Sequence, residues 1–199
     1  MKNNTYTFQA YDFESADPLT RFLNESLKPL FAKSVYGKRL GKMHFQGDET
    51  VLDFGCGNGV STRWLATELP RGRIIGVDTS KFWLNLAHKR LVAFSNVELY
   101  AVDIAAVPLP PKLDAVTIFH VIHDIPPEQR TAIFKTVVER VRPGGSLLIW
   151  EPTRPSHGMP VSEIHNLAET NNFELIKKEQ KKSSFLGIFQ RKNITKSHK

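Results

Sequence analysis

The sequence contains little cysteine and no long hydrophobic run. Cys56 is the only cysteine in 199 residues, so no internal disulfide can form, and its place between two glycines favours a tolerated small residue over a nucleophile. No run of about 18 apolar residues is present, which leaves no candidate for a transmembrane helix. The polar, aromatic N-terminus also lacks the apolar region of a signal peptide. We therefore expect a cytoplasmic protein.

Metal-binding motifs are scarce as well. His120 and His123 lie three residues apart, and two histidines at this spacing can supply a pair of metal ligands. No clear third ligand is found near them in the sequence. The sequence therefore predicts no metal site.

Acidic residues are nearly missing from two segments that hold most of the net charge of +7. Residues 28–42 contain five Lys or Arg and no acid, and residues 177–199 contain eight Lys or Arg against Glu179 alone. Such segments suit RNA, an anionic lipid surface or an acidic small substrate as partners. The alternative is a solvated surface whose lysines protect an edge strand.

A short apolar strand that leads into three alternating glycines is the most informative motif. Residues 51–59 read VLDFGCGNG, and the helix-like segment after them would offer free backbone N–H groups to a ligand. Glycine permits positive φ and lets a ligand approach the backbone closely. The dinucleotide motif G-x-G-x-x-G would need glycine at position 60, where this chain has Val60. The motif indicates a nucleotide-binding turn and counts against NAD.

Two further strand-like segments each end in an acidic residue. Asp78 ends the first and lies 19 residues beyond Gly59, a spacing that suits a carboxylate bound to ribose hydroxyls. Asp103 ends the second. Together with VRPGG at residues 141–145, these motifs resemble those of the class I S-adenosylmethionine-dependent methyltransferases over roughly residues 48 to 152.

The resemblance implies that S-adenosylmethionine binds here and leaves as S-adenosylhomocysteine. In that family Asp78 falls at the ribose position and Asp103 at the position that reads the adenine amino group. Asp53 falls where the family orients the glycine loop or reaches the cofactor through water, with a purely structural role as the alternative. The residues implied to bind the cofactor are Asp53, Gly55, Cys56, Gly57, Asn58, Gly59, Asp78, Thr79, Ser80, Asp103, Ile104, Phe119 and His120.

Strand and helix patterns alternate along the chain, which is typical of a parallel sheet covered by helices. Thr79 and Ser80 can cap the second helix. The predicted strands lie near residues 50–54, 73–78, 97–102, 114–119, 145–151, 173–178 and 184–190, and the predicted helices near 60–69, 80–93, 128–141 and 161–171.

The resemblance implies an α/β fold: a Rossmann-like, doubly wound, mostly parallel seven-stranded sheet with the last strand antiparallel and helices on both faces. We expect residues 46–190 to form the methyltransferase domain and residues 191–199 a basic, disordered tail. Residues 1–45 are expected to form a helical cap, whose aromatic side chains either close over the cofactor or only pack against the domain.

Two histidines follow the fourth predicted strand, where the resemblance places catalytic residues. His120 or His123 could take a proton from a hydroxyl or a protonated amine, since imidazole titrates near neutral pH, and Asp124 could orient it. Stacking near the methionine part of the cofactor, or a bond to the backbone, is the alternative for both.

The loop after the fourth strand also narrows the acceptor. It lacks the Asn or Asp followed by Pro-Pro and an aromatic residue that is usual in enzymes methylating adenine or glutamine amino groups. We therefore predict methyl transfer to O or N of a small-molecule acceptor. An RNA methyltransferase that uses the basic ends and a non-catalytic S-adenosylmethionine-binding protein are the alternatives.

Overall fold

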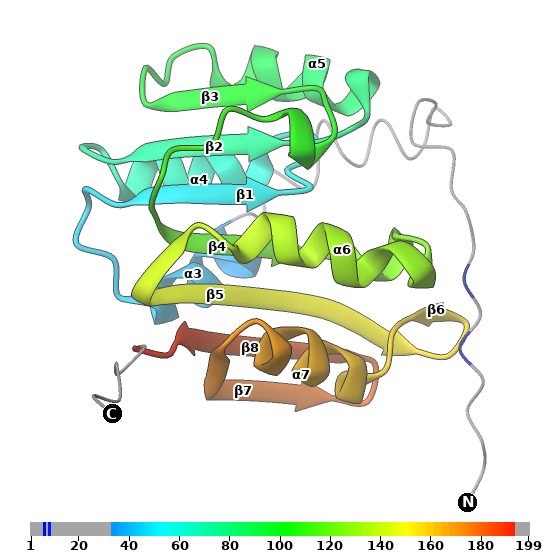
Figure 1. Cartoon of the computed structure of the whole chain (residues 1–199). Coiled ribbons are helices and arrows are strands. Elements are labelled where there is room, and N and C mark those ends of the chain that lie inside the picture. The colour runs from blue at the N-terminus through cyan, green and yellow to red at the C-terminus, as the bar shows by residue number, and fades with distance from the viewer. Residues whose placement is uncertain (1–5, 7, 9–32, 194–199) are drawn as a thin grey trace, which may run out of the picture. The chain divides into compact units, whose positions relative to one another are not determined.

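The structure is a computed structural model that describes Tyr6, Phe8 and residues 33–193 (Figure 1). The chain divides into two compact units, one of residues 10–109 and one of residues 1–9 and 110–199. Most of the expected N-terminal cap (residues 1–45) and the end of the expected basic tail (residues 191–199) lie outside the described residues. None of the helices within the described part is long and apolar enough to cross a membrane.

The unit of residues 10–109 is built on three parallel strands in the order β3-β2-β1. The strands are β1 (Thr50–Phe54), β2 (Arg73–Val77) and β3 (Val97–Tyr100). Helices α4 (Val60–Glu68) and α5 (Lys81–Leu91) both lie on one face of these strands (Figure 1). The centres of β1 and β2 are apolar and almost fully buried, as parallel strands covered by helices require, whereas β3 is partly buried; the buried residues include Val51, Leu52, Ile74 and Ile75.

Short helical turns complete this unit. They are the π-helical turn η2 (Lys33–Gly37), α3 (Lys38–Leu40), η3 (Gly41–Met43) and, after β3, η4 (Ile104–Ala106). A Cβ atom on Gly37 would lie 2.8 Å from Trp64 Cζ2. The absence of a side chain at Gly37 therefore lets the indole of α4 pack against η2.

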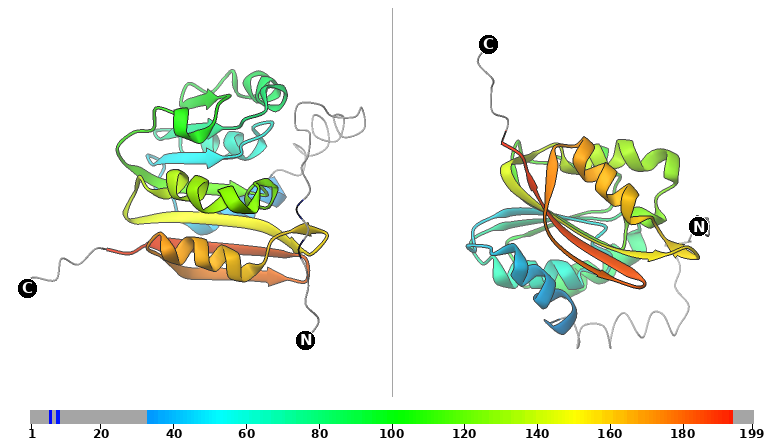
Figure 2. Two further views of the ribbon diagram at one scale, coloured as in Figure 1. Left: turned by 45° about the vertical axis from the view of Figure 1, so that its right-hand side comes forward. Right: turned by 90° about the horizontal axis from the view of Figure 1, so that it is seen from below.

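The described part of the second unit contains four long strands in the order β4-β5-β8-β7. They are β4 (Leu113–Phe119), β5 (Val141–Arg154), β7 (Phe173–Lys181) and β8 (Ser184–Arg191). The two-residue strand β6 (His157–Gly158) pairs with the end of β5, and the turn η5 (Ile122–Asp124) follows β4. Helices α6 (Pro127–Val138) and α7 (Val161–Thr170) lie on the same face of this sheet (Figure 2).

The strand order along the sheet is β3-β2-β1-β4-β5-β8-β7, which confirms the expected Rossmann-like, mostly parallel topology. The last strand, β8, runs antiparallel to both β5 and β7. Two details differ from the prediction. β5 begins at Val141 rather than at 145, because the RPGG segment bulges out between the paired positions Leu113↔Val141 and Ala115↔Ser146. The polar segment after Pro152, which lies outside the predicted strands and helices, forms a hairpin through β6.

Candidate active site

The glycine loop between β1 and α4 folds against the end of β2. The backbone N–H groups of Gly55 and Cys56 both donate to the Val77 carbonyl, at 2.8 and 3.0 Å. The N–H of Gly57 donates to Asp78 Oδ2 at 2.8 Å. All three glycines of the motif have positive φ, at 70°, 51° and 76°. The loop therefore turns sharply and brings its centre to the carboxylate of Asp78.

Two of these glycines have different reasons to lack a side chain. A Cβ on Gly57 would meet no described atom within 4 Å, so the space in front of Gly57 is open to a ligand. A Cβ on Gly59 would lie 2.9 Å from Leu91 Cδ1 and 3.0 Å from Ala87 Cβ, so Gly59 permits α4 and α5 to pack closely. Asn58, between them, accepts a hydrogen bond on its carbonyl from Arg90. An open, glycine-lined turn before a helix N-terminus fits a nucleotide-containing cofactor.

Asp78 is oriented by two backbone donors. Its Oδ1 accepts from the N–H of Ser80 at 2.9 Å, and its Oδ2 accepts from Gly57. The Ser80 hydroxyl accepts from the N–H of Trp83 at 3.2 Å, which confirms the predicted cap of the second helix, while Thr79 is exposed. A half-exposed carboxylate fixed in this way is suited to bind ribose hydroxyls.

Asp103 lies beyond the end of β3. Its Oδ1 accepts from the N–H of Ala105 at 2.8 Å and so begins η4, whose first residue, Ile104, is buried. The N–H of Asp78 donates to the Tyr100 carbonyl at 3.2 Å, so the ends of β2 and β3 are adjacent. Asp78 and Asp103 thus follow the carboxyl ends of neighbouring parallel strands, where ligands bind in sheets of this kind.

Two side chains of the motif point into the protein. Asp53 is 1% exposed, and its Oδ2 accepts from the hydroxyls of Ser61 at 2.8 Å and Thr62 at 2.7 Å, which anchors the first turns of α4 to β1. Cys56 packs in a buried apolar cluster with Leu84 and other α5 side chains. Burial, with the negative charges of Asp53 and Asp78, raises the pKa of the Cys56 thiol well above its usual value, so the thiol is protonated at neutral pH.

In the second unit, β4 ends at Phe119, and His120 follows it directly. The Phe119 side chain is largely buried, with its ring 6.2 Å from that of Trp150. His120 has φ of 59°, its N–H donates to the Trp150 carbonyl at 2.8 Å, and its ring lies edge to face with Trp150 at 4.2 Å. A non-glycine residue with positive φ is uncommon, and such residues gather at functional sites.

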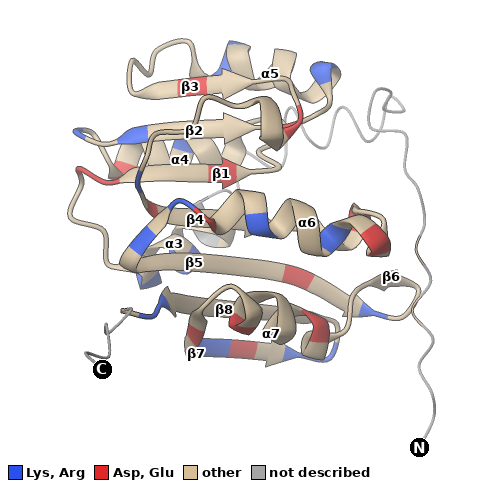
Figure 3. Ribbon diagram, viewed as in Figure 1, with Lys and Arg blue, Asp and Glu red and all other residues tan. Residues whose placement is uncertain are grey.

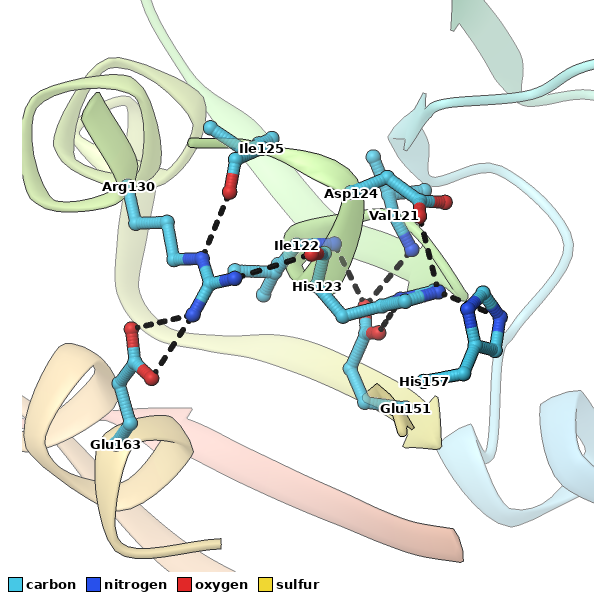
Figure 4. Close-up of polar contacts among 9 residues, drawn as sticks. All are labelled: Val121, Ile122, His123, Asp124, Ile125, Arg130, Glu151, His157 and Glu163. Atoms are coloured by element: carbon cyan, nitrogen blue, oxygen red, sulfur yellow. Dashed lines mark hydrogen bonds and ion pairs between the residues drawn. The ribbon is translucent and has the colours of Figure 1, made fainter. Parts of the chain in front are cut away.

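His123, in η5, is held by a buried carboxylate (Figure 4). Its Nδ1 lies 2.6 Å from Glu151 Oε2, and Glu151 is completely buried. The other oxygen, Oε1, accepts from the N–H groups of Val121 and Ile122, both at 2.9 Å. With Glu151 as a carboxylate, which can only accept, the contact requires the proton of His123 on Nδ1, and a neutral ring then presents a lone pair at Nε2. Glu151 thus fixes both the ring and the tautomer.

Arg130, on α6, holds the main chain of the same turn. This residue is 5% exposed, and its guanidinium donates to the carbonyls of His123 at 3.0 Å and Ile125 at 2.9 Å. It also donates from Nη1 to both carboxylate oxygens of Glu163 on α7, at 3.0 Å each. The turn that carries His123 is therefore fixed from the helix side as well as from β5.

Asp124 and His157 lie at the Nε2 side of His123. Asp124 Oδ1 is 3.3 Å from His123 Nε2, and His157 Nε2 is 3.2 Å from the same atom (Figure 4). Burial raises the pKa of Asp124, although His123 and His157 nearby act in the opposite direction. The sequence suggested Asp124 as the residue that orients His123. In the structure Glu151 holds the ring through Nδ1, and Asp124 lies at Nε2.

Sequence reasoning missed Glu151, Arg130 and Glu163, and it offered His157 only as a residue of the loop after the fifth strand that contacts substrate or is solvated. One signal was available: Glu151 ends the otherwise apolar run LLIW at the close of a predicted buried strand. A buried strand rarely ends in an acid without a partner.

Comparison with known proteins gives the class. Residues 51–145 match the family model of a methyltransferase domain. Trans-aconitate 2-methyltransferase of Azoarcus sp. (strain BH72) is 31% identical over 121 residues, which cover 59% of this chain and 46% of that protein. The structure of a SAM dependent methyltransferase from Aquifex aeolicus superimposes with a TM-score of 0.74 at 17% identity, covering 88% of this chain and 99% of that one.

A second solved structure has the same fold. N-methyltransferase NodS from Bradyrhizobium japonicum WM9, in complex with S-adenosyl-L-homocysteine, gives a TM-score of 0.71 at 18% identity over 90% of this chain and 95% of that one. The match over residues 51–145 and the shared fold agree with the class I S-adenosylmethionine-dependent methyltransferases that the resemblance implied. The chain spans about half or less of the length of the curated relatives that it matches.

Proposed function

We propose that this protein transfers a methyl group from S-adenosylmethionine to an oxygen or nitrogen of a small-molecule acceptor, and that His123 takes the proton of that acceptor. The observation that carries the proposal is the buried pair of His123 Nδ1 and Glu151 Oε2 at 2.6 Å. A histidine with a purely structural role does not need a fully buried carboxylate as its partner. A general base gains from such a carboxylate, which fixes the tautomer of the ring and stabilises the imidazolium.

The residues of the first unit bind the cofactor in this proposal. Asp78 accepts hydrogen bonds from the ribose hydroxyls, Asp103 and Ile104 contact the adenine, and the open face of Gly57 receives the amino acid part. The side chains of Asp53 and Cys56 are buried, so these residues contribute to cofactor binding by positioning the backbone of the glycine loop. When bound, S-adenosylmethionine supplies a methyl group on a positively charged sulfonium, so the chain must chiefly orient the acceptor and exclude water.

His123 then removes the proton that the acceptor loses. Its Nε2 is reached past the exposed ring of His157, and displacement of that ring opens the way for the acceptor. Glu151 keeps Nδ1–H in place while Nε2 accepts the proton, and Arg130 prevents the turn from shifting. His120 is assigned a contact role, because its ring packs edge to face against the ring of Trp150.

A small acceptor is favoured over RNA. The relative named above acts on trans-aconitate, a small molecule. The lysines of the β7 region do not form an unbroken basic surface, because Glu174 and Glu179 lie on the same strand as Lys177, Lys178 and Lys181 (Figure 3). Mixed charges of this kind attract phosphates weakly.

The test is formation of S-adenosylhomocysteine by the purified chain in the presence of S-adenosylmethionine and single acceptors. The panel contains trans-aconitate, phenols, primary amines and carboxylic acids, with a total RNA sample at low salt as a further arm. Turnover that depends on one small acceptor supports the proposal. Cofactor binding without turnover on any acceptor would favour the non-catalytic alternative, and turnover on RNA alone would replace the small acceptor.

A further inference from the structure

Three potential metal ligands converge beside the His123–Glu151 pair. His123 Nε2 lies 3.2 Å from His157 Nε2 and 3.3 Å from Asp124 Oδ1. One ligand atom from each residue lies within 4.8 Å of the other two. The residues come from η5 and from the β6 hairpin, 34 positions apart in the sequence, so the fold assembles this group.

The hydrogen bond to Glu151 determines what His123 presents to this group. With its proton on Nδ1, neutral His123 offers only a lone pair at Nε2. Ionised Asp124 offers only acceptor oxygens, and two acceptors 3.3 Å apart repel each other unless a positive charge lies between them. A proton or a metal cation satisfies this arrangement.

The surroundings resemble those of a metal-bound histidine. Such a histidine usually donates its second N–H to a carboxylate, which fixes the ring and makes the ligand nitrogen more basic. Glu151 does this for His123, and Glu151 is itself held by two backbone N–H groups. His157 is exposed, so a cation from solvent has a path to the ligands.

The ligand types select the ion. Two imidazole nitrogens and one carboxylate oxygen suit Zn²⁺, whereas Mg²⁺ and Ca²⁺ require mainly oxygen ligands. With metal–ligand distances of about 2.0–2.1 Å, neighbouring ligands of a tetrahedral Zn²⁺ lie roughly 3.3–3.4 Å apart. The two distances from His123 Nε2, 3.2 Å to His157 and 3.3 Å to Asp124, match that spacing, and the His157–Asp124 pair lies within 4.8 Å.

We infer that His123, His157 and Asp124 form a site for Zn²⁺ or a similar transition-metal ion, with Glu151 as the positioning residue and one coordination position left for water. The sequence predicted no metal because the third ligand is distant along the chain. The site itself does not depend on the proposed function. Only the effect of the metal on methyl transfer rests on the proposed function. A metal bound to His123 Nε2 occupies the atom that takes the proton of the acceptor, so the ion acts as a regulator of transfer and not as its cofactor.

The test is calorimetric titration of the purified, metal-free full chain with zinc chloride, without cofactor or acceptor. We expect one zinc per chain, and an affinity lowered at least about tenfold by His157→Ala and by Asp124→Ala. His88→Ala is the matched control, because His88 is exposed on α5 and outside the cluster, and it should bind as the unchanged chain does. His157 is on an exposed hairpin, so its replacement should leave thermal unfolding unchanged.

Co²⁺ provides a second readout, since four-coordinate Co²⁺ absorbs visible light far more strongly than the hydrated ion. The strong band should appear with the unchanged chain and disappear with His157→Ala. No binding by the unchanged chain, or equal zinc affinity in the two alanine variants and the unchanged chain, would overturn the site. Because neither measurement uses turnover, failure of the metal site and failure of the proposed function are distinguished.

Discussion

The two units of the chain hold their polar groups in different ways. In the unit of residues 10–109, Asp78 and Asp103 accept hydrogen bonds from nearby backbone N–H groups at the ends of strands. In the other unit, buried Glu151 pairs with His123 and buried Arg130 pairs with Glu163, contacts that join positions 28 and 33 residues apart. The first site is therefore a set of separable local contacts, whereas the second is a network whose members depend on one another.

The largest expected effect comes from His123. Replacement by Ala should lower kcat by about 10²–10⁴-fold, the usual contribution of a general base, while the affinity for S-adenosylmethionine stays the same. His120→Ala is the matched control and should lower kcat much less. The measurement is steady-state turnover with an acceptor found by the panel above, together with calorimetric binding of the cofactor. Equal losses in both variants would remove the distinction between these two histidines.

The glycine loop allows a sharp contrast within one motif. Gly59→Ala should destabilise the fold by roughly 2–4 kcal/mol, because the new Cβ overlaps Leu91 and Ala87 and the backbone has φ of 76°. Gly57→Ala suffers only the strain of positive φ, about 1–2 kcal/mol, but should weaken cofactor binding because it fills the open space. Thermal unfolding and cofactor titration of both variants check this. A Gly57 variant that binds normally would show that the ligand does not approach this face.

Asp78 tests the local character of the first site. Asp78→Ala should weaken binding of S-adenosylmethionine by about 1.5–3 kcal/mol, the scale of hydrogen bonds to a charged group. Asp78→Asn should recover part of the affinity, because its carbonyl can still accept from Gly57. Calorimetry with S-adenosylhomocysteine is the measurement. Unchanged affinity in the Ala variant would exclude the ribose assignment.

The smallest expected effect concerns the ion pair between β2 and β3. Arg73 Nε lies 2.7 Å from Glu98 Oε1, with side chains 41% and 40% exposed. The hydrogen bond from Arg73 lowers the pKa of Glu98, so its stabilisation exists above the ordinary value of 4.5 and is lost as pH falls below it. Arg73→Gln should cost about 0.2–1 kcal/mol at pH 7. Urea unfolding should show this difference vanishing below about pH 4; a constant difference would mean lost packing instead.

The same contrast explains what the sequence could predict. The strand ends, the glycine turn and the Ser80 cap are short-range features, so composition and spacing located them. His123 and His120 were proposed for the same reason, since both closely follow a strand. Glu151 and Arg130 have roles that exist only after β4, β5 and α6 are packed, because each contact joins positions whose proximity no local pattern encodes. His157 is brought to His123 by the two-residue pairing of β6 with β5, which no local pattern predicts.

The antiparallel insertion of β8 has a consequence for how the chain is made. β5 and β7 both pair with β8, at residues 184–191, and these are the last residues of the sheet to be synthesised. Until they leave the ribosome, the edges of β5 and β7 that will face β8 have no strand partner within the sheet. A nascent chain that stops before Ser184 should therefore need a chaperone or aggregate. Pairing of β8 with β5 and β7 covers these strand edges and removes this tendency to aggregate.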